Sequence, residues 1–334
     1  MALKNNTWKL NQWYDQDVAG NVSYSGAKLL YAAGDPKTYG QLGLNDRTAR
    51  SSPVQIPGTN WRQLGVGQDE AVTATKTDGT LWAWGRNTWG NLGHNNRTEY
   101  SSPTQIPGTT WALSTATGAV AGATKTDGTM WAWGYNGMGA LGQNTQGNPT
   151  SRSSPVQVGS NTDWSVVCEP GEAQNHTFVI NTSGELFSVG RNSSGQLGLN
   201  NTTYYSSPVQ IPGTTWRYVT ASETGSAATK TDGTLWSWGY NRYGKLGLNE
   251  AGNNYSSPKQ VGSDTTWNRV FAGTSCTWAT KTDGTLWAWG ENVSGNLGQN
   301  NRTNYSSPVQ VGSNTDWNLV SSTQANGLLA LTNT

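Results

Sequence analysis

The sequence is poor in the residues that most protein chemistry requires. Its 334 residues include two histidines and two cysteines, and charged residues make up 12% of the chain, with a formal net charge of +1. This balance excludes the basic surface that nucleic-acid binding needs. No apolar run approaches the length of a membrane span, and the first residues lack the apolar core of a signal peptide. We therefore expect a soluble protein that inserts into no membrane and binds no nucleic acid.

Glycine (42) and tryptophan (18) are abundant, and both recur in one repeated unit. Residues 76–93, KTDGTLWAWGRNTWGNLG, return almost unchanged at 125–142, 230–247 and 281–298, and more loosely at 181–198 and 26–43. The second glycine of the G-x-N-x-x-G segment recurs about every 50 residues, at Gly40, Gly90, Gly139, Gly195, Gly244 and Gly295. A unit of this length accommodates about four short strands, and no helical periodicity interrupts it.

The unit reads as four β-strands in succession. In residues 81–84 (LWAW), the two Trp side chains project from one face of a strand, and Leu and Ala from the other. Stacked sheets can therefore fit the Trp face of one against the Leu/Ala face of the next. Asp78-Gly79 predicts a tight hairpin before this strand, and Pro103 marks an outer edge strand because it lacks an N–H. The pattern predicts an all-β protein, a β-propeller.

The repeat favours six blades, with seven as the alternative. The last copy of the first two strands starts at Trp317, and the first copy of the third and fourth strands starts at Leu29. Pairing of these N- and C-terminal strands in one shared blade closes the ring and removes free edges. Residues 27–334 then form the propeller, and residues 1–26 are a separate N-terminal anchor. Seven blades require residues 1–26 to supply a degenerate strand pair instead.

No catalytic or metal-binding constellation is evident. His94 replaces a Leu or Gln found at the same loop position of other copies, and His176 has no Cys or Asp in register with it. Cys168 and Cys276 occupy non-equivalent places, so we expect no disulfide. The repeated aspartates are interpreted as turn residues, which are Asp78, Asp127, Asp232 and Asp283. We expect no enzyme activity, no cofactor and no metal.

Two sets of side chains are candidates for binding. Aromatic and Met residues at variable turn positions predict a contact ring of Tyr39, Trp89, Tyr135, Met138, Tyr240 and Tyr243. The alternative is that these rings merely cover neighbouring turns. A second set precedes Ser-Ser-Pro in loops rich in Asn, Thr and Arg, and consists of Tyr100, Tyr205, Tyr255 and Tyr305. Such residues can hold a sugar, or they can fasten the loop to the edge strand.

The G-x-N-x-x-G-x-L-G run after a Leu-Trp-x-Trp strand, with Asp-Gly before it, resembles the RCC1 (regulator of chromosome condensation) repeat. The resemblance covers about residues 27–334 and six copies. It implies an RCC1-like β-propeller. Members of this family include a guanine-nucleotide exchange factor, a protein inhibitor of β-lactamase and a plant UV-B photoreceptor. Guanine-nucleotide exchange or a chromatin-associated role is therefore one functional alternative.

Residues 7–21, TWKLNQWYDQDVAGN, look similar to the N-terminal segments of structural proteins in tailed phages of marine cyanobacteria. This resemblance implies a virion protein of the tail-fibre or decoration type, anchored through Trp8, Trp13 and Tyr14. Its partners are then other virion proteins or a host-surface receptor or glycan. We expect a non-enzymatic structural or interaction propeller located in the virion, with a lectin-like glycan-binding propeller as an alternative.

Overall fold

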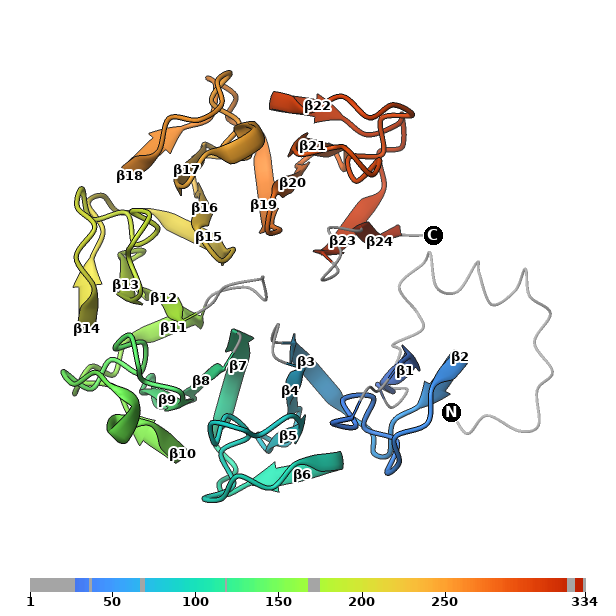
Figure 1. Cartoon of the computed structure of the whole chain (residues 1–334), viewed down its shortest axis with the longest axis vertical. Coiled ribbons are helices and arrows are strands. Elements are labelled where there is room, and N and C mark those ends of the chain that lie inside the picture. Colours follow the sequence, from blue (N-terminus) through green and yellow to red (C-terminus); the bar gives the residue numbers. More distant parts are fainter. Residues whose placement is uncertain are drawn as a thin grey trace, which may run out of the picture.

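The computed structural model is a ring of β-sheets around a central axis (Figure 1). The structure describes residues 28–35, 38–66, 70–117, 119–167, 175–322 and 328–332. The predicted N-terminal anchor with Trp8, Trp13 and Tyr14 lies outside these residues, and so does Cys168. Within these ranges, no helix is both long enough and apolar enough to cross a membrane.

Five of the sheets have four antiparallel strands each, ordered along the chain from the centre of the ring outwards. We number them blades two to six. Blade two consists of β3 Trp61–Val66, β4 Ala71–Lys76, β5 Leu81–Gly85 and β6 Tyr100–Ile106. Blade three consists of β7 Trp111–Thr117, β8 Val120–Lys125, β9 Met130–Gly134 and β10 Arg152–Gln157. Blade four consists of β11 Trp164–Val167, β12 His176–Asn181, β13 Leu186–Gly190 and β14 Tyr205–Gln210.

Blades five and six repeat the pattern, and two-stranded sheets occupy the two ends of the chain. Blade five consists of β15 Trp216–Ala221, β16 Gly225–Lys230, β17 Leu235–Gly239 and β18 Tyr255–Gln260. Blade six consists of β19 Trp267–Ala272, β20 Cys276–Lys281, β21 Leu286–Gly290 and β22 Tyr305–Gln310. The two-stranded sheets are β1 Tyr31–Gly34 with β2 Arg50–Gln55, and β23 Trp317–Ser322 with β24 Leu328–Thr332. The short 3-10 helices are η1 Asn148–Thr150 and η2 Arg242–Gly244.

The two terminal sheets hold the four strand positions of one further blade. β1 and β2 are third and fourth strands, because Trp61 N–H donates to Lys28 O as Trp111 N–H donates to Gly79 O in the next blade. β23 begins at the Trp of a first strand. Counted together, the terminal sheets complete the six blades that the sequence favours. Among the described strands, β24 and β1 nevertheless belong to separate sheets, so the predicted pairing between them is not formed there.

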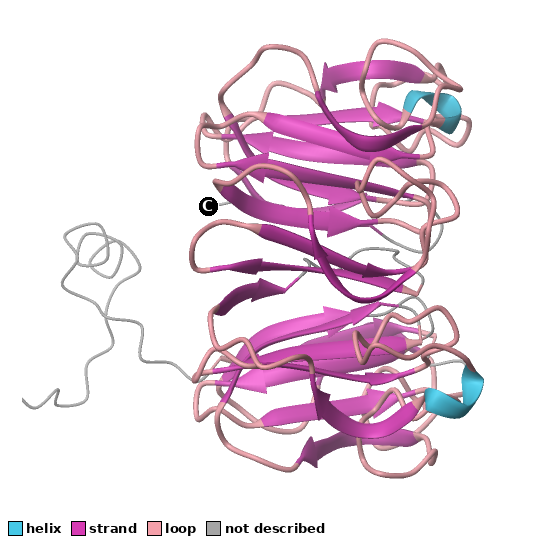
Figure 2. Ribbon diagram, turned by 90° about the vertical axis from the view of Figure 1, so that its left-hand side faces the viewer, coloured by secondary structure: helices cyan, strands magenta, loops and turns pink. Residues whose placement is uncertain are grey.

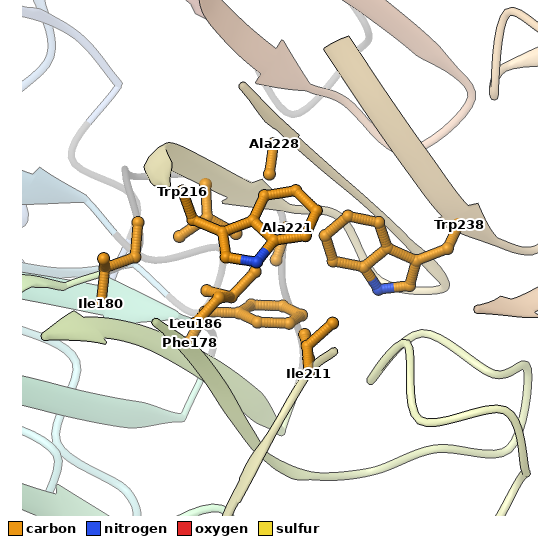
Figure 3. Close-up of a cluster of buried hydrophobic side chains, with 9 residues drawn as sticks. Phe178, Ile180, Leu186, Ile211, Trp216, Ala221, Ala228 and Trp238 are labelled. Atoms are coloured by element: carbon orange, nitrogen blue, oxygen red, sulfur yellow. The ribbon is translucent and has the colours of Figure 1, made fainter. Parts of the chain in front are cut away.

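The blades pack as the alternation of the third strand predicts. Leu81 and Ala83 of blade two lie in one buried cluster with Trp111 and Trp133 of blade three. Figure 3 shows the same arrangement between blades four and five, where residues of blade four surround Trp216 and Trp238 of blade five. Full burial of a large apolar side chain stabilises by up to about 3 kcal/mol. The buried tryptophans therefore supply a large share of the core, alongside Leu, Ile, Val and Ala side chains.

The repeated aspartates are turn residues, as predicted. Asp78 Oδ1 accepts hydrogen bonds from the Thr80 N–H at 3.0 Å and the Thr80 hydroxyl at 2.7 Å. These bonds hold the pKa of Asp78 below its ordinary value. The Thr80 hydroxyl in turn accepts from Trp82 Nε1 at 2.8 Å. Lys76 Nζ lies over two rings of the same blade, 4.6 Å from the Trp61 centroid and 4.3 Å from the Trp82 centroid.

The ring has two faces of different construction. The Asp-Gly hairpins lie on one, which we call the hairpin face. The loops that join the third and fourth strands, with their G-x-N-x-x-G turns, lie on the other, which we call the turn face. Both 3-10 helices belong to such loops, and Figure 2 shows them on the same side of the ring.

Candidate functional site on the turn face

Each turn is organised by its buried asparagine. In blade two, Asn87 Nδ2 donates to Thr98 O at 2.8 Å, and Asn87 Oδ1 accepts from Leu92 N–H at 3.0 Å. Asn136, Asn192, Asn241 and Asn292 make the same Oδ1 bond in the other complete blades. The amide satisfies backbone groups that no strand pairs. This framework allows the neighbouring positions of the turn to vary without loss of the fold.

The turns of blades one to five also contact the next blade, through a feature that the sequence analysis missed. Gly90 has φ +79°, and a Cβ there would lie 2.6 Å from Ser153 Cα of blade three. Asn95, also at positive φ, donates its N–H to Ser153 O at 2.6 Å. Equivalent bonds join Asn45 to Ser101, Asn144 to Ser206, Asn200 to Ser256 and Asn249 to Ser306. The sequence does carry a sign of this contact. An Asn recurs at the position of Asn95 in every copy, and Asn is one of the residues that most often adopt positive φ.

The predicted contact ring divides into two halves. In blades one to three, its side chains are paired across blade boundaries. The guanidinium of Arg86 stacks 5.0 Å from the Tyr39 ring centroid, and the rings of Trp89 and Tyr135 lie 4.7 Å apart. These contacts match the alternative in which the rings cover neighbouring turns. Met138 is half-buried on the same side.

In blades four to six, large apolar side chains remain exposed on the turn face. Tyr204 is 36% exposed, Tyr240 37% and Val293 54%. Tyr240 occupies the turn position of Tyr135, but Ser194 stands where Trp89 stands two blades earlier and offers no ring to cover it. Tyr204, Tyr240 and Val293 lie in the turn-face loops of three successive blades, and we call them together the exposed turn patch. Tyr204 and Val293 were not predicted, and no pattern within a single copy distinguishes them.

Charged groups occupy the loops of the same blades on the turn face. Arg191 forms an ion pair with Glu223 at 3.6 Å. The guanidinium of Arg242 lies 4.6 Å from the ring centroid of Tyr243, which is half-buried and has φ 60°. Tyr243, the remaining predicted contact residue, is therefore placed beside Tyr240 but covered on one side by its own turn.

The second predicted set lies at the starts of the outer strands rather than within loops. Tyr100, Tyr205, Tyr255 and Tyr305 are the first residues of β6, β14, β18 and β22, and all are half-buried. Asn96, Asn201 and Asn301 donate to three of the hydroxyls at 3.0–3.1 Å, and Tyr255 hydrogen-bonds Glu250. These bonds fasten each loop to its edge strand. A role in sugar binding stays a prediction for this set.

The histidines contribute packing. His94 lies edge-on to Tyr100 with ring centroids 5.0 Å apart, and burial lowers the pKa of His94. His176 is buried in β12, 5.7 Å from the Phe178 ring. In the described part of the chain, no three His, Cys, Asp or Glu residues are grouped to hold a metal ion.

Comparison with known proteins agrees with this geometry. The regulator of chromosome condensation (RCC1) repeat matches residues 78–124, 127–168, 183–229, 232–280 and 283–322. The fold is similar to yeast RCC1 (Prp20), from a crystal structure of Kap60 bound to it, with a TM-score of 0.74 and 19% identity over 92% of this chain and 77% of that one. It is also similar to human WBSCR16, with a TM-score of 0.73 and 19% identity over 92% of this chain and 82% of that one.

A third solved structure is Prp20p from Saccharomyces cerevisiae, described with its binding properties to Gsp1p and histones. Its TM-score is 0.56, at 17% identity over 90% of each chain. No curated protein sequence matches the chain. Stacked four-stranded sheets with repeated turns define a β-propeller of the RCC1 type. Because the repeat matches more than half of the sequence, the chain belongs to the RCC1 repeat family.

Proposed function

We propose that this propeller is a non-enzymatic interaction protein that binds a protein partner through the turn face of blades four to six. The observation that carries the proposal is the asymmetry of that face. Tyr39, Trp89 and Tyr135 are engaged with neighbouring blades, whereas Tyr204, Tyr240 and Val293 are exposed. Exposed Tyr side chains flanked by Arg are typical of binding hot spots.

Tyr240 is the expected centre of this surface. Its backbone N–H donates to Thr224 O, next to Glu223 of the Arg191–Glu223 ion pair, and the Arg242–Tyr243 stack follows in the same turn. An aromatic residue with charged pairs nearby suits a partner with a small apolar anchor and polar surroundings. Solved proteins of similar fold are described with protein partners, since yeast RCC1 is seen with Kap60 and Prp20p is described with Gsp1p and histones. Those partners are not transferred to this chain.

We further propose that the protein is a component of a virion and that its partners include other virion proteins. The support is the similarity of residues 7–21 to phage structural proteins, together with the position of Lys28. Its carbonyl accepts from Trp61 N–H, which places Lys28 on the hairpin face, opposite the exposed turn patch. An anchor formed by residues 1–26 then attaches the ring on one side and leaves the turn face directed outwards, towards the host surface or neighbouring virion proteins.

Capture experiments test both parts. The full chain, a chain of residues 27–334 and the Tyr240→Ala variant are immobilised and exposed to a lysate of infected cells, and retained proteins are identified by mass spectrometry. Loss of a hot-spot Tyr costs about 2 kcal/mol, or roughly thirtyfold in affinity. We expect Tyr240→Ala to lose the turn-face partner and the shortened chain to lose virion proteins.

The matched control is Tyr135→Ala, at the equivalent turn position of blade three, which should retain the partner. Equal loss in both variants would contradict the placement on blades four to six. The circular dichroism of the shortened chain is measured first. If removal of residues 1–26 unfolds the ring, the segment belongs to the fold and the anchor is excluded.

A further inference from the structure

A hollow of about 380 Å³, with both polar and apolar surface, opens on the hairpin face between blades three and four. The hairpin of blade three borders it with Lys125, Thr126, Asp127 and Gly128. The approach to β11 and its first residues border the other side, with Thr162, Asp163, Trp164 and Ser165. Ala112, Thr124 and Thr182 complete the lining. The volume falls within the range of small-molecule sites, which is roughly 300–1,000 Å³.

Two small residues, Ala112 and Ser165, line the hollow at this boundary. They belong to a set of residues that follow the Trp at the start of each first strand, which are Arg62, Ala112, Ser165, Arg217, Asn268 and Asn318. Between blades three and four, the flanking pair is Ala112 and Ser165. At every other boundary between complete blades, at least one of the two is Arg or Asn. The two short side chains line the hollow without filling it.

The lining offers hydrogen-bonding groups of both kinds. Lys125 Nζ lies 4.0 Å from the Trp131 centroid and 4.8 Å from the Trp111 centroid, which holds the ammonium in place. Asp127 Oδ1 is held by the Thr129 hydroxyl at 2.7 Å, and Asp163 Oδ2 accepts from Asn181 Nδ2 at 3.2 Å. Residues that carry an ammonium, two carboxylates and several hydroxyls therefore line one space. Because the charged groups are already positioned, little ordering is needed when a ligand binds.

We infer that this hollow is a binding site for a neutral sugar residue. Two carboxylates against one ammonium disfavour a phosphate or other anion, and the ammonium disfavours a free cation. The charged groups of the lining disfavour a wholly apolar ligand, since these groups would lose water without new partners. Sugar hydroxyls donate hydrogen bonds to carboxylates and accept them from an ammonium, so a sugar can pair with both kinds of charged group in the lining. This site lies on the face opposite the exposed turn patch and does not depend on the function proposed there.

Saturation-transfer NMR on the full chain tests the site. The probes are methyl α-mannopyranoside, methyl β-galactopyranoside and N-acetylglucosamine, each added separately at millimolar concentration. Ala112→Arg fills the hollow with the residue that blades two and five carry at the same position, so the fold accommodates it. The control is Asn268→Arg, which adds the same side chain in blade six, away from the hollow.

We expect saturation transfer to at least one probe with the natural chain and with Asn268→Arg, and its loss with Ala112→Arg. Asp163→Asn should weaken binding about tenfold, because a hydrogen bond to a charged group is replaced by a neutral one. Absence of transfer to all three probes, or transfer that persists in Ala112→Arg, overturns the inference. Near-UV circular dichroism verifies that each variant keeps its native packing, and loss of transfer in both Arg variants counts against the assigned position.

Discussion

The indole Nε1 of Trp133 donates a hydrogen bond to the backbone carbonyl of Asn91 in the preceding blade, at 3.0 Å. Trp84, Trp238 and Trp289 make the same bond to Gln41, Gln196 and Lys245. Blade four has Val189 at this position and has no such donor there. The second Trp of the repeated strand therefore has two structural roles. Its ring packs in the hydrophobic boundary between two blades, and its indole N–H forms a hydrogen bond across that boundary.

Trp133→Phe should lower the free energy of unfolding by about 1–3 kcal/mol, because it removes this donor and leaves a buried carbonyl unsatisfied. Urea unfolding followed by circular dichroism measures the change. The control is Trp131→Phe, since Trp131 is half-buried and donates to the Thr129 hydroxyl of its own blade at 2.9 Å. An equally large effect of the control would show that aromatic volume, and not the bond between blades, accounts for the loss.

Gly90→Ala should destabilise the ring far more than Gly295→Ala. Both glycines have nearly the same backbone, with φ +79° and +80°, so both variants incur the same left-handed strain of about 1 kcal/mol. At Gly90 the new Cβ would also lie 2.6 Å from Ser153 Cα, whereas nothing lies within 4 Å at Gly295. We expect a further loss of about 1–3 kcal/mol for Gly90→Ala from this clash. Similar unfolding midpoints for the two variants would argue against close contact between blades at this turn.

Asp264 should contribute stability that depends on pH. Its carboxylate lies 2.5 Å from Lys281 Nζ, and this hydrogen bond lowers the pKa of Asp264 to about 2. A carboxyl whose pKa is lower in the folded state stabilises the fold above its unfolded pKa of about 4, and that contribution is lost as the pH falls towards the folded value. The difference in urea midpoint between the natural chain and Asp264→Asn should therefore be greatest above about pH 4 and shrink towards pH 2. A difference that stays constant over this range would contradict the assignment.

Tyr135→Ala and Tyr240→Ala should differ in their effect on stability. Tyr135 stacks on Trp89, and loss of an aromatic pair costs about 0.5–1.5 kcal/mol beyond the lost area. Tyr240 is 37% exposed, so its removal should change the free energy of unfolding by no more than about 0.5 kcal/mol. Thermal unfolding of the two variants measures this. A marked destabilisation by Tyr240→Ala would indicate that Tyr240 serves packing and not binding.

The sequence by itself determined the blade. The alternating Leu-Trp-x-Trp strand, the Asp-Gly hairpin and the Pro-containing edge strand are local features, and each recurs at a fixed interval. In a repeat protein each unit contacts mainly its neighbours, so one local pattern determines the packing at every equivalent boundary between blades. The prediction that the Trp face of one blade meets the Leu/Ala face of the next was confirmed for this reason.

Only the tertiary structure decided which variable residues are accessible. Whether a turn side chain is covered depends on a residue in the adjacent blade, as Trp89 covers Tyr135 while Ser194 leaves Tyr240 exposed. The hollow is likewise lined by Ala112 of one blade and Ser165 of the next, although neither residue is unusual within its own copy. Exposure and cavities are properties of pairs of blades, which a comparison of single copies does not reveal. The repeat therefore specifies the ring, and the differences between neighbouring copies specify its surface.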